Sequence, residues 1–275
     1  MSGQQGERIL TPIVDLVNAS PNEDRTEQFK RLWGILDKMH KRISERFELQ
    51  LDPACSELVN YELDSGYKGT TEAYVGPEID WYIHSWCGHP SQTFSNMHIT
   101  ITLGPQYLVP NFGFALGTVP DLFMYMDYLP RVDLLNNIDY ADRYYTEVNE
   151  EFLELQANPE FKPFISRDLY TRIAMTPTAV GYGADPSNDN IAVAEAVAMS
   201  RLERWLKWVD DAEKTPVEMR AELAQRDHRI RRNICERDPA NQVAANIYGD
   251  EFADKLVKTI SAANRSLPRP TGGYE

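Results

Sequence analysis

Short strands that follow one another too closely for helical crossovers dominate the middle of the chain. Between residues 79 and 127, two kinds of side chain alternate with the period of two that is typical of β-strands, and turn signals such as Leu103-Gly104-Pro105 separate the runs. Parallel strands need a crossover of about a dozen residues or more, and these connections are shorter. The sequence therefore predicts a mainly antiparallel sheet. It disfavours a dinucleotide-binding sheet, and it contains no GxGxxG or GxxxxGK[ST] motif.

Helical patterns come before and after these strands. The segment Ser20-Pro21-Asn22-Glu23 resembles a capping box that would begin a helix ending near Glu48, and Thr215-Pro216-Val217-Glu218 is a second one. A Gly- and Pro-rich stretch over residues 176–189 is expected to be a loop before a long helix. Strands in the middle with helices on both sides predict an α+β fold, a three-layer α/β/α sandwich with a central antiparallel sheet.

The chain shows no internal linker, so we expect one catalytic domain. It should span residues 20–265, with a flexible lead-in over 1–19 and a flexible tail over 266–275. No apolar run is long enough for a bilayer, and the first residues lack the apolar core of a signal peptide. We therefore expect a cytoplasmic protein without membrane contact. The three cysteines are widely spaced and form no CxxC, which favours reduced thiols over disulfides or metal ligation.

The charge balance narrows the range of partners. The chain has 28 Lys and Arg against 42 Asp and Glu, a net charge of −14. Phosphate backbones would be repelled on average, so nucleic-acid binding is not expected. For the same reason, the chain offers an acidic carrier protein no obvious docking site.

Polar and aromatic side chains occupy one alternation of the strands, where a core would need aliphatic ones. The set comprises Asp80, Tyr82, His84, Trp86, Asn96, His98, Thr100, Thr102, Asp121, Phe123, Tyr125 and Asp127. These side chains could simply face water, as in many antiparallel sheets. Solvated faces favour Lys, Glu and Arg, however, and the set contains none. A cleft with a few convergent polar groups is what a small-molecule site needs, so we interpret this face as a pocket.

Histidines are the first candidates for acid–base work on this face. An imidazole titrates near neutral pH, and we expect His84 and His98 to share the face on neighbouring strands, although either could be a structural histidine. Asp80 and Asp127 could orient a histidine or act as bases. We expect no metal site, because His89 lies in a turn and the spacing is not that of a metal centre. The expected substrate-binding residues are Tyr82, Trp86, Asn96, Phe114, Phe123, Tyr125 and Arg131.

Several stretches resemble one known family. The strings NFGFALGTVPDLFMYMDYLPRVDLL, FKPFISRDLYTRIAMTPTA and RDHRIRRNICERDPANQVAANIYGDEFADKLVKTI are similar to red chlorophyll catabolite reductase. This resemblance implies the fold shared with ferredoxin-dependent bilin reductases, with a pocket between one sheet face and the C-terminal helices. It also implies a homodimer. The family reductases protonate an open-chain tetrapyrrole with pocket carboxylates while ferredoxin supplies electrons. Asp238 matches one of these carboxylates.

The second family carboxylate has no counterpart here, because NFGFALG contains neither Asp nor Glu. On this ground we predict a different activity on the same fold. The prediction is a cofactor-independent acid–base lyase of the kind suspected among bacterial relatives, which opens a lignin-derived phenylcoumaran dimer and releases formaldehyde to leave a stilbene. The substrate would be a bulky aromatic molecule. The first alternative is a reductase of red chlorophyll catabolite or a bilin, which would need reduced ferredoxin. The second alternative is a non-catalytic protein that binds a bilin or another aromatic molecule.

Overall fold

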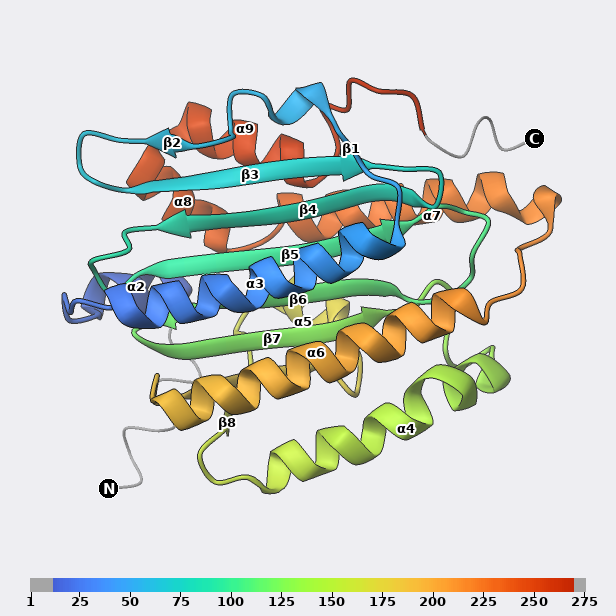
Figure 1. Ribbon diagram of the computed structural model, residues 1–275, viewed down its shortest axis with the longest axis horizontal. Helices are drawn as coiled ribbons and strands as arrows, with labels where there is room; N and C mark the ends of the chain where they lie inside the picture. Colours follow the sequence, from blue (N-terminus) through green and yellow to red (C-terminus); the bar gives the residue numbers. More distant parts are fainter. Residues whose placement is uncertain (1–11, 270–275) are drawn as a thin grey trace.

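A large antiparallel sheet lies between two layers of helices in the computed structural model, which describes residues 12–269 (Figure 1). The strands are β1 (Gln50–Leu51), β2 (Tyr61–Glu62), β3 (Lys68–Val75), β4 (Ile79–Gly88), β5 (Ser95–Leu103), β6 (Asn111–Val119), β7 (Asp121–Leu129), β8 (Lys162–Pro163) and β9 (Val180–Ala184). The helices are α2 (Ile13–Ala19), α3 (Thr26–Arg46), the 3-10 helix η1 (Pro53–Cys55), α4 (Ile138–Ala157), α5 (Leu169–Ala174), α6 (Asn188–Asp210), α7 (Val217–Glu236), α8 (Ala240–Tyr248) and α9 (Asp250–Ile260).

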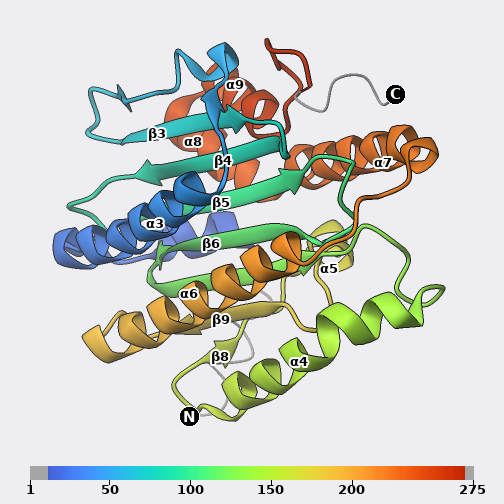
Figure 2. The same ribbon diagram turned by 45° about the vertical axis from the view of Figure 1, so that its right-hand side comes forward.

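The predicted α+β sandwich is confirmed. The strand order is β1-β3-β4-β5-β6-β7-β9-β8, and every pairing in the described part of the chain is antiparallel. In Figure 1, α3, α6 and α4 cover the front of the sheet, and α7, α8 and α9 lie behind it. Figure 2 shows β9 and β8 extending the sheet beyond β7, on the side of α4. Among residues 12–269, no helix combines the length and apolar character needed to cross a bilayer.

The front layer and the sheet form the main core. The residues Leu32, Ile35, Leu36 and Met39 recur at helical spacing along α3 and are fully buried. The sheet meets them with alternate aliphatic side chains, such as Met97, Ile99, Ile101 and Leu103 of β5. This alternation leaves the other side of β5 free for polar residues. The front layer therefore fixes which side chains can face the second layer.

Local signals misplaced several boundaries. The first capping box does not begin α3, because Pro21 and Glu23 instead bind the Thr93 hydroxyl; α3 begins at Thr26, whose amide binds Asp24. The expected loop over residues 176–189 contains strand β9, since its glycines hid a strand pattern. Residues 13–19 of the expected lead-in form α2.

At the other end, the amides of Ser266 and Leu267 in the expected tail donate to the Asp52 carboxylate. Residues 1–11 and 270–275 lie outside the described part.

Arg131 holds the second helix layer to the sheet. The residue is only 2% exposed. Its Nε donates to the Oδ2 atom of Asp227 in α7 at 2.9 Å. The guanidinium also donates to the carbonyls of Leu103, Gly104 and Tyr107 in the turn after β5. Burial raises the pKa of Asp227, while Arg131 acts in the opposite direction. Every donor of the guanidinium is therefore committed to structure, and the expectation that Arg131 binds substrate is wrong.

Replacing Arg131 by Met should lower the free energy of unfolding by about 3–5 kcal/mol, because the buried Asp227 carboxylate would lose its close ion pair and keep only the longer contact with Arg226, at 3.6 Å. The measurement is urea unfolding followed by fluorescence. In the matched double variant Arg131→Met/Asp227→Leu the buried pair is removed as a whole, so much of the lost stability should return. A single variant as stable as the wild type would show that the pair does not anchor α7.

Candidate functional site

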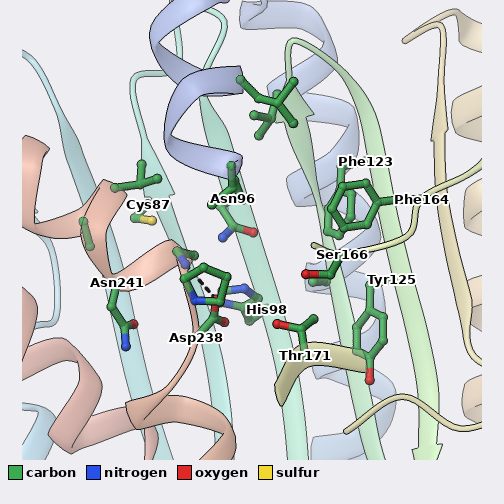
Figure 3. A pocket seen from close by; sticks show the side chains of 18 of the residues that line it. Cys87, Asn96, His98, Phe123, Tyr125, Phe164, Ser166, Thr171, Asp238 and Asn241 are labelled. Atoms are coloured by element: carbon green, nitrogen blue, oxygen red, sulfur yellow. Dashed lines mark hydrogen bonds between the residues drawn. The ribbon is translucent and has the colours of Figure 1, made fainter. Parts of the chain in front are cut away.

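A large cavity separates the back face of the sheet from the second helix layer. Its volume is about 1180 Å³, which exceeds the usual range for drug-sized ligands of roughly 300–1,000 Å³. The sheet forms one wall, and the ends of α7, α8 and α9 form the opposite wall. The segment of residues 162–174, which ends in α5 and which we call the α5 segment, closes one remaining side, and the short helix α2 closes another (Figure 3).

Two strands present almost no side chain to this cavity. The central residues of β6 on the cavity side are Gly113, Ala115 and Gly117, and those of β9 are Gly181 and Gly183. Of these, Ala115, Gly181 and Gly183 border the cavity. The neighbouring strands β5 and β7 carry large side chains on the same face. The sheet therefore has two low strips, one along β6 between the side chains of β5 and β7, and one along β9 on the far side of β7. We call the two strips together the glycine floor. A flat ligand can lie directly on the backbone there.

Registry places His98 at the edge of this floor. Paired residues of neighbouring strands share a face, and Ser85, His98, Ala115, Tyr125 and Gly181 form one such row across the sheet. The next row is Cys87, Asn96, Gly117, Phe123 and Gly183. Figure 3 shows Asn96, His98, Phe123 and Tyr125 on the strands behind the cavity. Four of the expected site residues on the strands thus meet at one place.

His98 is uncharged near neutral pH. Burial lowers the pKa of its ring to about 4, because the surrounding protein cannot solvate an imidazolium. The ring is only half-buried, and among residues 12–269 no side chain hydrogen-bonds it. Both ring nitrogens are therefore available to a ligand, one as donor and one as acceptor.

Asp238 lies on the opposite wall of the cavity from His98. It follows α7, and its Oδ1 accepts the amide of Ala240 at 2.8 Å, which fixes the carboxylate at the start of α8. The side chain is accessible to water because it borders the cavity. Burial in the surrounding protein raises the pKa of Asp238, the hydrogen bond from the Ala240 amide acts in the opposite direction, and the nearby Asp168 adds to the rise. Asp238 thus keeps a proton at a higher pH than an ordinary carboxyl group does.

The remaining walls combine aromatic rings with hydroxyl groups. Phe123 and Phe164 pack edge to face at 5.8 Å, and Ser166 and Thr171 of the α5 segment also border the cavity (Figure 3). The Tyr125 hydroxyl donates to Asp127 at 3.4 Å, and burial raises its pKa well above 10. The ligand would therefore meet neutral hydrogen-bonding groups in a mostly apolar chamber.

His84 lies on the other face of the sheet. Its partner in β5 is Ile99, whereas His98 pairs with Ser85. The ring is buried under α3, stacked on His40 at 4.5 Å and on Trp33 at 4.7 Å, and it contacts Glu72 at 3.1 Å. The prediction that the two histidines share a face is wrong, because the connection from β4 to β5 offsets the two alternations by one residue.

Three of the side chains expected to bind the ligand lie on the same face of the sheet as His84. Tyr82 binds His40 at 2.7 Å, Trp86 packs on Phe29 at 4.8 Å, and the Phe114 side chain is buried in the core. All three belong to the alternation that faces α3 or its neighbours, so their side chains point away from the glycine floor. Trp86 and Phe114 nevertheless border the cavity, and Tyr82 does not.

Two of the expected catalytic aspartates are held in structural contacts outside the cavity lining. Asp80 sits at a bulge of β4 and pairs with Arg231 at 3.1 Å and Arg265 at 2.9 Å. Burial alone would raise the pKa of Asp80, but the two arginines outweigh it and lower the pKa. Asp127 is 1% exposed and accepts the amides of Thr176 and Tyr128, both at 2.8 Å, and burial raises its pKa.

Sequence reasoning missed much of the cavity wall. Cys87, Phe164, Ser166, Thr171 and Asn241 border the cavity and were not among the expected site residues. Nothing local marks the residues of the α5 segment, because only the tertiary fold brings that segment over the sheet. The glycine floor did leave a signal, since small residues alternate with large ones in both NFGFALG and VGYGA.

Comparison with known proteins identifies the family. The profile described as red chlorophyll catabolite reductase (RCC reductase) matches residues 35–262. This chain belongs to the red chlorophyll catabolite reductase family. It is 26% identical over 203 residues to red chlorophyll catabolite reductase of Hordeum vulgare, covering 67% of this chain and 97% of the relative.

Two further relatives carry the same name. The chloroplastic protein of Arabidopsis thaliana is 29% identical over 202 residues, covering 67% of this chain and 63% of the relative. That of Oryza sativa is 25% identical over 203 residues, covering 68% and 61%. This chain thus spans less than two thirds of these two relatives.

A solved structure supports the fold independently. Phytochromobilin synthase from tomato in complex with biliverdin superposes with a TM-score of 0.72 at 14% identity, covering 88% of this chain and 84% of that one. The expected resemblance to red chlorophyll catabolite reductase and to the bilin reductase fold is confirmed.

These relatives contradict the predicted lyase. Each matched sequence is named a reductase, so the expectation of a formaldehyde-releasing lyase in lignin breakdown is wrong. The broader prediction that the chain is an enzyme is confirmed, because its relatives are named as enzymes. The lyase prediction depended on the missing carboxylate in NFGFALG. In the structure this strand is the floor, and His98 lies beside Ala115 on the neighbouring strand.

The face assignment can be tested by stability alone. His84→Ala should lower the free energy of unfolding by about 2–5 kcal/mol, because it empties a buried site between stacked rings. His98→Ala should change it by less than about 1 kcal/mol, because the ring borders the cavity and has no side-chain hydrogen bond to lose. Urea unfolding of both variants decides the matter. Equal losses in the two variants would contradict the assignment.

Proposed function

We propose that this enzyme reduces a conjugated double bond of an open-chain tetrapyrrole, either red chlorophyll catabolite or a bilin. The glycine floor is the observation that carries the proposal. A tetrapyrrole is a wide, flat molecule, and the small residues of β6 and β9 leave room for its rings on either side of the Phe123 and Tyr125 side chains of β7. The cavity of about 1180 Å³ is large enough for such a ligand. The names of the sequence relatives, and the biliverdin named with the tomato protein, support the same substrate class.

Asp238 is the proton donor in this proposal. Its raised pKa keeps a proton available, and it faces the floor from the opposite wall. A ligand between them would have Asp238 on one side and His98 at its edge. His98 is neutral, so its role is to hold a ring nitrogen or carbonyl of the ligand by a hydrogen bond and not to supply a proton as imidazolium.

The reduction needs two electrons and two protons for each double bond. Asp238 would deliver one proton and be reprotonated from solvent through the open part of the cavity, and the second proton would come from water or a neighbouring hydroxyl. Following the family, the electrons would come one at a time from reduced ferredoxin, which is oxidised. No further cofactor is required by this balance, because the tetrapyrrole itself accepts each electron.

Asp238→Asn should reduce kcat by roughly 10²–10⁴-fold, the usual contribution of a positioned acid. The wild-type rate should fall as the pH rises through the raised pKa of Asp238, because only the protonated form donates, and the variant should lose this dependence. The measurement is anaerobic turnover of biliverdin or red chlorophyll catabolite with reduced ferredoxin across pH. The exposed Glu236→Gln, which removes a carboxylate two residues away, is the control and should keep the wild-type profile. Turnover without any reductant would contradict the proposal.

The floor can be tested by filling it. A Cβ at Gly183 would meet only the Leu122 carbonyl, at 3.8 Å, so Gly183→Ala should fold normally and bind biliverdin nearly as well as the wild type. Gly183→Leu would raise the floor and should weaken binding at least about tenfold, or about 1.4 kcal/mol. Absorbance titration with biliverdin measures both. Unchanged affinity in the Leu variant would show that the ligand does not lie on β9.

A further inference from the structure

The segment through α5 carries an apolar surface next to the cavity. Ile165, Leu169, Tyr170 and Ile173 are 53%, 55%, 46% and 69% exposed. Single exposed apolar residues are ordinary on protein surfaces, but four within one short segment form a patch that suits contact with another molecule. The Ile165, Leu169 and Ile173 side chains do not border the cavity, so the ligand does not account for their exposure.

Positive charge surrounds this apolar patch. Lys162, Arg167, Arg172 and Arg237 are exposed, and within residues 12–269 none of them forms an ion pair with a carboxylate. Lys162, Arg167 and Arg237 also border the cavity, so these charges lie at its rim, whereas Arg172 does not border it. Arg237 lies over the Tyr170 ring at 4.2 Å, and Arg172 donates to the carbonyls of Ser166 and Arg167, both at 2.8 Å.

Asp168, the acidic residue of this segment, forms no ion pair with these four cations. The Asp168 carboxylate caps α5 by accepting the amides of Tyr170 and Thr171, at 2.8 and 3.0 Å. Positive groups without carboxylate partners are thus gathered around one apolar patch, on a chain whose net charge is −14.

Helix α5 is also the wall between this surface and the ligand site. Tyr170, Thr171 and Ala174 border the cavity, while Leu169, Arg172 and Ile173 do not. An α-helix with its side chains is roughly 10–12 Å across. A protein seated on the outer side of α5 would therefore be separated from the tetrapyrrole by about one helix diameter. Electrons can tunnel between protein-bound groups over such a distance without an intermediate carrier.

We infer that Ile165, Leu169, Tyr170, Arg172 and Ile173, with Arg167 and Arg237 beside them, form the docking surface for an acidic one-electron carrier protein. The inference depends on the proposed reductase function. An apolar centre with a charged rim is the usual composition of a transient interface, and the positive rim selects a negatively charged partner and speeds its approach. This surface supplies the local positive charge that the overall composition hides.

The electron balance fits a transient contact. Reduction of one double bond takes two electrons, and a one-electron carrier supplies one in each docking event. Each carrier molecule leaves oxidised, so the surface must release it before the next one arrives. Weak, salt-sensitive binding is therefore expected.

The test compares two reductants in the same variant. Arg172→Glu/Ile173→Asp reverses one charge and inserts another, at two side chains that do not border the cavity. With an acidic [2Fe–2S] ferredoxin as electron donor, the KM for ferredoxin should rise at least about tenfold. With reduced methyl viologen, a small donor that needs no docking surface, kcat and the KM for biliverdin should stay at wild-type values. Leu153→Asp, at an exposed apolar site on α4, is the control and should behave as wild type with both donors.

Four other results of this experiment would refute either the docking surface or the proposed reductase function. An unchanged KM for ferredoxin in the variant would refute the docking surface while leaving the reductase function intact. A variant that loses self-association in light scattering but keeps its ferredoxin kinetics would show that the patch joins two copies of this chain, and it would refute the inference. Equal loss with both donors would indicate damage to the cavity and would also refute it. Absence of wild-type turnover with either donor would refute the proposed function, and this inference with it.

Discussion

The registry of the central strands is the constraint on which the rest of this structure depends. Side chains in a strand alternate between faces, so a shift of one residue in pairing would exchange the faces of an entire strand. The pairing of β5 with β6 places His98 beside Ala115, and the pairing of β7 with β9 places Tyr125 beside Gly181. These pairings put the large side chains of β5 and β7 on either side of the bare strand β6. Gly181 and Gly183 of β9 lie on the same face, on the far side of β7. The two low strips exist because the registry puts these small residues on the cavity face.

The second helix layer turns this surface into a chamber. Asp238 follows α7, and α7 is held to the turn after β5 by the buried pair of Arg131 and Asp227. The cost of burying two charges is offset because the guanidinium also satisfies three backbone carbonyls. The Asp238 carboxyl group opposite the floor is thus positioned by an interaction outside the cavity. The front layer has no such role, and its stacked rings around His84 serve the core.

Much of the fold could be read from the sequence, and the reason for each failure is physical. Period-two alternation revealed the strands, and helical spacing revealed α3. Neither pattern says which residues of one strand share a face with which residues of the next strand. This relation depends on the connection between β4 and β5. Because the sequence does not give the relation, His84 was assigned to the face of His98. Strand β9 was missed because its glycines resemble loop residues, although those glycines form the floor. Asp238, Asn96, Phe123 and Tyr125 could be placed at the cavity because family resemblance or correct alternation located them.

The error about activity came from giving one absent carboxylate too much weight. A proton can reach a ligand from either wall of a chamber, and in the proposed function Asp238 supplies it from the wall opposite β6.

The central claim is that a flat tetrapyrrole lies on the glycine floor. A crystal structure of this enzyme with biliverdin tests it most directly. Our account predicts that the ligand lies against β6 and β9, with His98 at its edge and Asp238 over its opposite face. A ligand bound among the rings beneath α3, or one held away from both glycine strands, would contradict it.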